Sequence, residues 1–141
     1  MDTIQLGEFI TNHWELSFAF AVLLGMLILG EIQHKTRGFP DISPQQLIQL
    51  SNEQDITLLD VRNADELKNG SLQDDTHIPL PELNTRHSEL SPDKTVIVYC
   101  RSGHRSAKAC NLLKKLGFND LKNLNGGFMA WQNANLPINK A

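Results

Sequence analysis

The sequence predicts an α/β fold, with a mostly parallel sheet flanked by helices, preceded by a single transmembrane helix. Strand-like apolar segments alternate with helical patterns between residues 43 and 138, which is typical of parallel sheets. One of them, residues 95–100 (TVIVYC), is apolar without alternation, as expected of a central strand covered on both faces. Residues 16–30 are uncharged and almost wholly apolar. We therefore expect an N-terminal transmembrane anchor at residues 1–34, a linker at 35–42 and one domain at 43–138.

The apolar run at residues 16–30 is short for a membrane span. Fifteen helical residues cover about 22 Å, less than the roughly 30 Å of a hydrocarbon core. Including residues 9–15 gives a spanning length, so membrane contact is expected over residues 9–32. A cleaved signal peptide would have a basic segment where this chain has Glu8 and Glu15. A buried core helix would not run into a linker-like segment, so a membrane anchor is the favoured interpretation.

The charges that flank the apolar run predict its orientation. No Lys or Arg precedes it, whereas Lys35 and Arg37 follow it. By the positive-inside rule, the N-terminus lies outside and the domain in the cytoplasm, as in a single-pass protein of the cell inner membrane. The cytoplasm is reducing, which is consistent with a free thiol at Cys100.

The composition argues against several classes of protein. The chain has two cysteines, Cys100 and Cys110, too few for a disulfide framework, and neither has the neighbours of a structural zinc site. The net charge is −3, yet residues 41–93 carry eleven acids and three bases, while residues 94–122 carry seven bases and one acid. The basic block favours small anions but lacks interleaved aromatic residues, so no nucleic-acid partner is expected. We expect no metal and no cofactor.

Each further element of the domain has its own signal. Ser43 and Gln46 form a capping box around Pro44, which predicts a helix start. Gly117 follows a helical pattern that is basic in its last turn, which predicts a helix end. The remaining elements are a strand at 56–61, a brief helix at 63–70, a strand at 76–80, a helix at 81–90, a helix starting at Ser106, a short strand at 120–124 and a final helix within 125–134.

Polar residues follow two of the predicted strands. Asp60 and Arg62 end one strand, and Cys100 follows another. In parallel α/β sheets, ligands bind beyond the carboxyl ends of the strands. A short polar loop then connects Cys100 to the next helix; it reads Arg101, Ser102, Gly103, His104, Arg105. These positions are the candidate site.

A tight loop that opens onto a helix N-terminus points backbone N–H groups at one spot and so forms an anion cradle. A cysteine at its centre would be held as a thiolate by these dipoles and by Arg101 and Arg105. Gly103 lets the backbone turn. His104 is either a cation or proton donor for the substrate, or an exposed loop residue. The implied chemistry is attack by the sulfur of Cys100 on an anionic substrate.

The motifs "CRSGHRS", "LLDVR" and "LNGGFMAW" together resemble a single-domain rhodanese, preceded by a membrane helix as in some bacterial rhodanese-like proteins. The resemblance covers roughly residues 40–138. It implies that Cys100 takes a sulfane sulfur from thiosulfate or another donor as a persulfide and passes it to a thiol or cyanide-like acceptor. It also implies that the residues from Arg101 to Arg105 form the cradle, and that Asp60 and Arg62 buttress it.

The chain departs from this family pattern at one turn. The family usually has Gly-His-Ile-Pro-Gly-Ala before its third strand, whereas residues 70–80 read GSLQDDTHIPL. Ser71 and Asp74 therefore stand where His and Gly are expected. The "HIP" that begins at His77 comes too late to replace them and belongs to the strand. This departure bears on the local turn and not on the cradle.

Two other functions remain open from the residues alone. One is a phosphatase or arsenate-reductase-like enzyme; the other is a binding or scaffolding module for membrane-protein partners. Four residues separate Cys100 from Arg105, whereas cysteine phosphatases resemble Cys-x-x-x-x-x-Arg, and no acidic residue in the loop could protonate a leaving oxygen. This favours sulfur transfer. Cys110, beside an apolar helix stripe, is interpreted as a packing residue.

Overall fold

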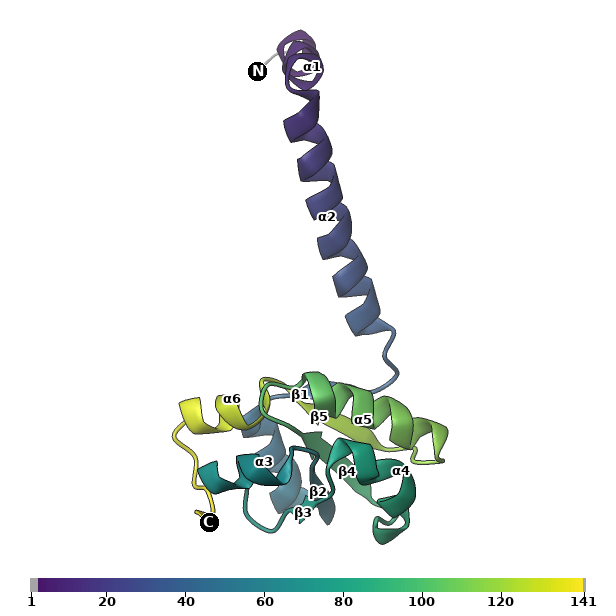
Figure 1. The fold of residues 1–141 in the computed structure, drawn as a ribbon, viewed down its shortest axis with the longest axis vertical. Coiled ribbons are helices and arrows are strands. Elements are labelled where there is room, and N and C mark those ends of the chain that lie inside the picture. Colours follow the sequence, from purple (N-terminus) through teal and green to yellow (C-terminus); the bar gives the residue numbers. More distant parts are fainter. Residues whose placement is uncertain (1–2, 141) are drawn as a thin grey trace. The chain divides into compact units, whose positions relative to one another are not determined.

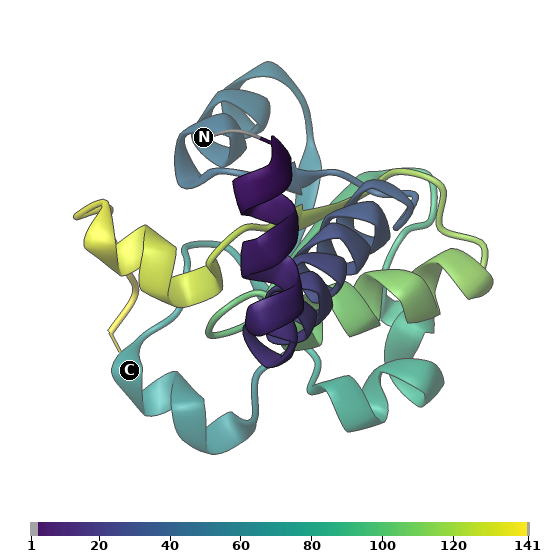
Figure 2. The ribbon, with the colours of Figure 1, turned by 90° about the horizontal axis from the view of Figure 1, so that it is seen from above.

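The computed structural model describes residues 3–140 and divides after Gly38 into an N-terminal unit and a C-terminal domain. Residues 1 and 2 of the expected anchor lie outside the described residues. The N-terminal unit holds helix α1 (Thr3–Asn12) and helix α2 (Trp14–Lys35). Figure 1 shows α1 end-on and α2 lengthwise, and Figure 2 shows the reverse, so α1 runs across the end of α2.

Helix α2 is long and apolar enough to cross a membrane. Its 22 residues span about 33 Å, and the stretch Trp14–Gln33 meets the length and composition of a membrane span, as a signal sequence would too. The expected upstream extension, residues 9–12, belongs instead to α1, because the backbone at His13 leaves the helical conformation (φ −127°, ψ 45°). Helix α2 reaches a spanning length because it continues at its C-terminal end as far as Lys35.

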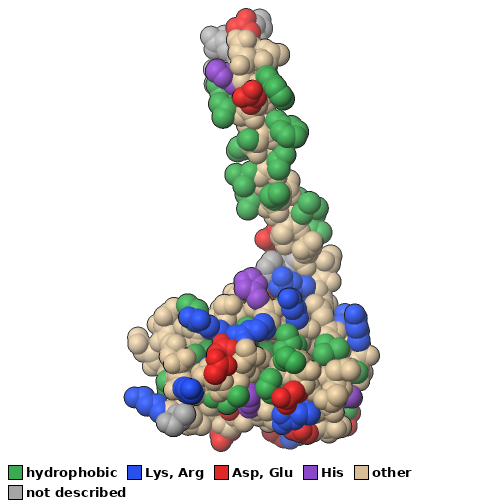
Figure 3. All heavy atoms as spheres, viewed as in Figure 1, with side chains coloured by type: hydrophobic (Ala, Val, Ile, Leu, Met, Phe, Trp, Pro, Cys, Tyr) green, Lys and Arg blue, Asp and Glu red, His purple; other side chains and the backbone are tan. Residues whose placement is uncertain are grey.

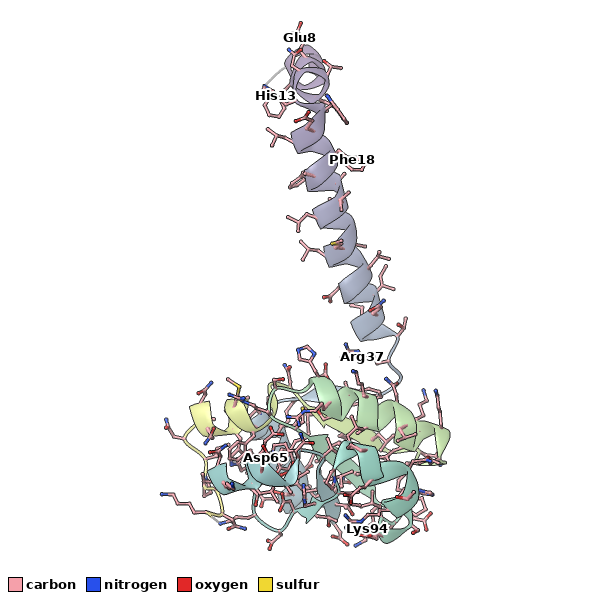
Figure 4. The ribbon with its side chains drawn as sticks, viewed as in Figure 1. Glu8, His13, Phe18, Arg37, Asp65 and Lys94 are labelled. Atoms are coloured by element: carbon pink, nitrogen blue, oxygen red, sulfur yellow. The ribbon has the colours of Figure 1, made fainter. Side chains whose placement is uncertain are left out.

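The side chains of α2 are exposed on every side of the helix. Apolar side chains line its length in Figure 3, and Phe18, which is 66% exposed, projects from it in Figure 4. A helix that is apolar all round does not fit a surface position on a soluble domain, but it fits hydrocarbon. The fold class is therefore as predicted: an α/β domain preceded by one apolar helix of spanning length.

The domain is built on a five-stranded sheet in the order β1-β5-β4-β2-β3, and all four pairings are parallel. Central strand β4 lies between β5 and β2, and helices cover both faces of the sheet (Figure 1). The strands are β1 (Asp41–Ile42), β2 (Ile56–Asp60), β3 (Thr76–His77), β4 (Thr95–Tyr99) and β5 (Leu121–Leu124). The helices are α3 (Pro44–Glu53), α4 (Leu83–Arg86), α5 (His104–Lys115) and α6 (Gly127–Asn133), with 3-10 turns η1 (Ala64–Asn69), η2 (Leu80–Glu82) and η3 (His87–Glu89).

The differences from the predicted elements concern short segments. Strand β1 lies within the range expected as linker and pairs with β5 through Asp41↔Asn123. The helices predicted at 63–70 and 81–90 are 3-10 turns or, in α4, one short α-helical segment. Helix α5 begins at His104, two residues before the predicted Ser106. The predicted capping box at Ser43 and Gln46 is present.

The unalternating apolar pattern of β4 is explained by two separate cores. Val96 and Val98 point into a core with α4 and α5, while Ile97 and Tyr99 point into a core with α3 and α6. All four are fully buried. The second core includes Trp131 of α6. Because both faces are covered, successive residues of β4 are apolar, as predicted.

The turn before α6 brings its backbone against the residues that follow β4. Gly126 and Gly127 both have positive φ, +72° and +56°. The N–H of Phe128 donates to the carbonyl of Cys100 at 2.8 Å, and that of Met129 donates to Arg101 at 3.1 Å. A Cβ at Gly127 would lie 2.3 Å from the Cys100 carbonyl oxygen. Only glycine fits at position 127, and its lack of a side chain lets the start of α6 pack directly against the end of β4.

We predict that Gly127→Ala lowers the free energy of unfolding by roughly 3 kcal/mol, because the new Cβ forces the backbones of α6 and the Cys100 loop apart. Gly117→Ala is the matched control: its φ is +98°, but a Cβ there meets nothing within 4 Å, so its cost is about 1–2 kcal/mol of left-handed strain. Denaturant unfolding of the full chain in detergent measures both. Equal losses in the two variants would contradict a steric role for Gly127.

Candidate active site

The loop after β4 surrounds the sulfur of Cys100 with hydrogen-bond donors. The side chain is 1% exposed. Its Sγ accepts from the N–H of Gly103 at 3.1 Å and from the hydroxyl of Ser106 at 3.4 Å. The donors around the sulfur therefore come from the loop and from the first turn of α5. Ser106 was expected only as the first residue of the helix, and its contact with sulfur follows from the earlier start of α5.

The environment of Cys100 favours its thiolate. Burial is the largest influence and raises the pKa of the thiol, but hydrogen bonds from Ser106, Gly103 and Ser102 together leave the pKa below its ordinary value. A thiolate stabilised by fixed donors is a nucleophile at lower pH than a free cysteine. The site can therefore perform nucleophilic attack by sulfur.

Gly103 is the residue at which the loop turns into α5. Its φ is +100°, and it caps the N-terminus of α5. Its carbonyl accepts from the Asn123 side-chain amide at 3.3 Å, and the same amide donates to Asp41 at 2.8 Å. The loop is thereby tied to the residues of β5 and β1. These contacts hold the donors in place before any substrate arrives.

Asp60 and Arg62 form a buried ion pair below the loop. The guanidinium contacts the carboxylate through Nη2–Oδ2 at 2.6 Å and Nε–Oδ2 at 2.9 Å. Arg62 also donates to the carbonyl of Gly70 at 2.8 Å and stacks over the ring of Phe128, with 4.4 Å from Cζ to the ring centroid. Since Phe128 binds the Cys100 carbonyl, Arg62 contacts the loop through α6 and not directly.

Arg105 faces a partner that the sequence did not reveal. Its Nη1 and Nη2 lie 2.6 and 2.7 Å from the two carboxylate oxygens of Glu66. This bond to Arg105 lowers the pKa of Glu66 to about 2, so the pair is ionised at neutral pH. Two guanidinium N–H groups of Arg105 are therefore engaged with protein. Glu66 was not among the predicted site residues, because it lies 39 residues from Arg105 along the chain, in η1. Its signal in the sequence is a negative charge, opposite to the positive charge of the loop.

The other loop residues point into solvent. Arg101, Ser102 and His104 are exposed. Within residues 3–140, neither Arg101 nor His104 has a side-chain hydrogen bond or ion pair. Arg101 is therefore the basic side chain of the loop that is free to meet an anion. The two interpretations of His104 both agree with this exposed position.

The turn that departs from the family pattern is organised around Tyr99. Asp74 has φ +56°, a left-handed conformation that glycine or a short polar residue adopts. The hydroxyl of Tyr99 donates to Asp75 and accepts from the N–H of Leu72 at 3.2 Å. His77 contacts the Arg62 carbonyl through Nε2 at 2.8 Å. Tyr99 thus ties the turn to β4, and the turn leads into β3.

The second cysteine is part of the core. Cys110 is fully buried in α5, and burial raises the pKa of its thiol to about 12. It packs as predicted. Among the described residues, no three His, Cys, Asp or Glu side chains are grouped so that they could hold a metal ion.

We predict that Ser106→Ala raises the pKa of Cys100, because the thiolate loses the side-chain donor that contributes most to stabilising it. The rate of alkylation by iodoacetamide against pH should shift to higher pH, with the fold retained. Cys110→Ser, made in both backgrounds, isolates the Cys100 signal and should leave the profile unchanged. An unshifted profile in Ser106→Ala would show that the backbone donors alone hold the thiolate.

Comparison with known proteins identifies the family. The Rhodanese-like domain family matches residues 43–134. A sulfurtransferase of Allochromatium vinosum is 37% identical over 70% of this chain and 92% of its own length. The thiosulfate sulfurtransferase GlpE of Shewanella oneidensis is 31% identical over 69% of this chain and 96% of its own. The crystal structure of a rhodanese-related protein from Thermoplasma volcanium is 34% identical, with a TM-score of 0.64 over 71% of this chain and 97% of that one. The chain belongs to the rhodanese family.

Proposed function

We propose that this protein is a membrane-tethered sulfurtransferase that carries a sulfane sulfur as a persulfide on Cys100. The observation that carries the proposal is the sulfur of Cys100 beneath the Gly103 N–H and the Ser106 hydroxyl, at the carboxyl edge of a parallel sheet. A sulfurtransferase-like role also agrees with the rhodanese family and with the names of its relatives. Donor and acceptor sulfur compounds are the substrates of such a role.

The proposed cycle has two displacement steps, written here for thiosulfate. The Cys100 thiolate attacks the outer sulfur of thiosulfate, the sulfur–sulfur bond breaks, and sulfite leaves with the electron pair. The product is a Cys100 persulfide whose terminal sulfur is anionic. An acceptor thiolate or cyanide then attacks that terminal sulfur, and Cys100 leaves again as thiolate. No oxidant or reductant is consumed.

Each candidate residue has a role in this cycle. The N–H groups of Ser102 and Gly103 and the hydroxyl of Ser106 stabilise the thiolate and the persulfide. Arg101 is the free cation for the anionic part of the donor. Arg105 is held at the border of the loop by its ion pair with Glu66, and His104 borders the exposed side of the loop. Asp60 and Arg62 support the loop from below.

We further propose that α2 anchors the domain in the cell inner membrane. The helix has the required length and composition. Lys35 and Arg37 follow it, and no Lys or Arg precedes it, which by the positive-inside rule puts the N-terminus outside and the domain in the cytoplasm. A tethered sulfurtransferase would exchange sulfur at the membrane surface, where membrane-protein partners can reach it.

We predict that thiosulfate adds one sulfur atom to the full-length protein, because the Cys100 thiolate displaces sulfite. Intact-mass spectrometry after alkylation measures the adduct. Cys100→Ser should abolish it, and Cys110→Ser, a buried cysteine matched in chemistry, should retain it. Sulfur on Cys110, or on the Cys100→Ser variant, would contradict the assignment. Absence of sulfur on Cys100 with every donor tried would instead favour a scaffolding role.

The membrane proposal has its own test. The full chain should stay in membranes through carbonate extraction, because a spanning apolar helix is not released by high pH. Protease added to intact cells should leave the domain undigested, and lysis should expose it. Replacing Leu24 and Leu27 with Arg should release the protein into the soluble fraction. Digestion of the domain from outside intact cells would reverse the proposed topology.

A further inference from the structure

Asn123 is a polar residue buried in an otherwise apolar part of the sheet. It lies in β5 and is 3% exposed, and the leucines on either side of it along the strand, Leu121 and Leu124, belong to the two cores. A buried amide lowers stability unless both its oxygen and its nitrogen find hydrogen-bond partners. An apolar side chain would satisfy the packing of β5 equally well, so the amide needs another explanation.

The amide of Asn123 is oriented by two acceptors. Its Nδ2 donates to Oδ1 of Asp41 at 2.8 Å and to the carbonyl of Gly103 at 3.3 Å. Both partners only accept hydrogen bonds, so the NH₂ group must face them. The amide oxygen then points elsewhere, and it has no hydrogen-bond partner among the described residues. An unpaired buried oxygen destabilises the fold, so the residue serves its two acceptors at the expense of stability.

One of these acceptors belongs to the residue that donates to the reactive sulfur. The N–H of Gly103 lies 3.1 Å from Sγ of Cys100. The peptide planes that hold this N–H and the Gly103 carbonyl meet at the same Cα, so fixing the carbonyl restricts the direction of the N–H. Glycine has the widest conformational freedom of any residue. The contact with Asn123 therefore limits the loop at the position where it could move most.

The other acceptor belongs to the edge strand β1, the first element of the domain along the chain. Asp41 is paired with Asn123 in the register of β1 and β5, and the backbone N–H of Asn123 donates to the carbonyl of Pro40 at 3.0 Å. Backbone and side-chain contacts thus hold Asn123 against β1. A continuous series of hydrogen bonds runs from Asp41 through Asn123 and Gly103 to the sulfur of Cys100.

Resting on the proposed function, we propose that Asn123 is a positioning residue for sulfur transfer: held by Asp41, it aims the Gly103 N–H at the sulfur of Cys100. Neither Asn123 nor Asp41 contacts the sulfur in the structure, so both act through Gly103. A donor fixed in advance stabilises the thiolate that attacks and the thiolate that leaves, without reorganising at either step. Strand β1 thereby contributes to the reactivity of a cysteine that it does not touch.

The test uses the full chain in detergent, in a Cys110→Ser background, and follows alkylation of Cys100 by iodoacetamide against pH. Arg105, which interacts electrostatically with Cys100, is retained in every variant. Asn123→Ala should move the midpoint of the profile up by about half a pH unit, because the Gly103 N–H is less well aimed. Loading from thiosulfate near neutral pH should then slow about threefold.

Three matched variants separate positioning from a general loosening of the sheet. Asp41→Ala, at an exposed position, should move the profile in the same direction as Asn123→Ala. Asp41→Asn keeps an acceptor oxygen and should restore the original profile. Asn125→Ala removes an exposed amide two residues beyond Asn123 and should change neither the profile nor the loading rate.

An unshifted profile in folded Asn123→Ala would overturn the assignment, and so would an equal shift in Asn125→Ala. If Asn123→Ala does not fold, Asp41→Ala decides, and an unshifted profile in that variant would overturn the assignment too. Failure of thiosulfate to load the unmodified protein, with the alkylation profiles shifted as expected, would count against the proposed sulfur transfer but support the role of Asn123 in holding the thiolate. The two conclusions therefore fail separately.

Discussion

Two opposite charges lie inside the domain, Asp60 at 0% and Arg62 at 1% exposure. Removing one member of such a pair strands the other in a medium where charge is poorly solvated, at a cost of about 3–5 kcal/mol. With both present, the ion pair holds the planar guanidinium in one orientation, and from there the guanidinium makes its other contacts. It fixes the Gly70 carbonyl and the ring of Phe128. The turn to β3, the start of α6 and, through Phe128, the carbonyl of Cys100 all depend on this orientation.

Ion pairing also decides how many of the basic side chains near the reactive sulfur carry an uncompensated charge. The sequence places several bases in the loop and the following helix, yet Arg105 is matched by Glu66. The unmatched base beside the sulfur is Arg101. The thiolate is consequently held mostly by backbone and hydroxyl dipoles, which do not depend on ionic strength as a surface cation would. Its stabilisation should be similar in dilute buffer and at physiological salt.

Local signals were sufficient for much of the fold. The unbroken apolar run before Cys100 predicted a central strand, and the capping box at Ser43 predicted the start of α3. Strand β1 has only two residues. Two residues are too few to show a strand pattern in the sequence, so β1 is recognised only by its pairing with β5. The segment after Asn63 forms a 3-10 turn although its pattern is helical, because too few residues are available for a stable α-helix.

The same distinction applies to the site. Cys100 and its loop are contiguous, so their arrangement could be predicted from spacing. The contacts of Glu66 and Met129 with that loop join segments far apart in the chain. These contacts depend on the order of the strands in the sheet and on where the glycine turn places α6. No local pattern in the sequence predicts the order of the strands. The start of the helix was predicted two residues too late, at Ser106, because the left-handed Gly103 allows the helix to begin at His104.

The burial of Cys110 has a consequence for the lifetime of sulfur on the protein. A persulfide beside an accessible thiol is short-lived, since the thiol can form an internal disulfide and expel hydrogen sulfide. Here the chain's only other cysteine is packed in the core, where burial raises the pKa of its thiol to about 12. In the proposed cycle, a loaded Cys100 has no internal resolving partner. In that cycle the sulfur leaves when an external acceptor attacks it, so the loaded domain would store the sulfur until an acceptor arrives.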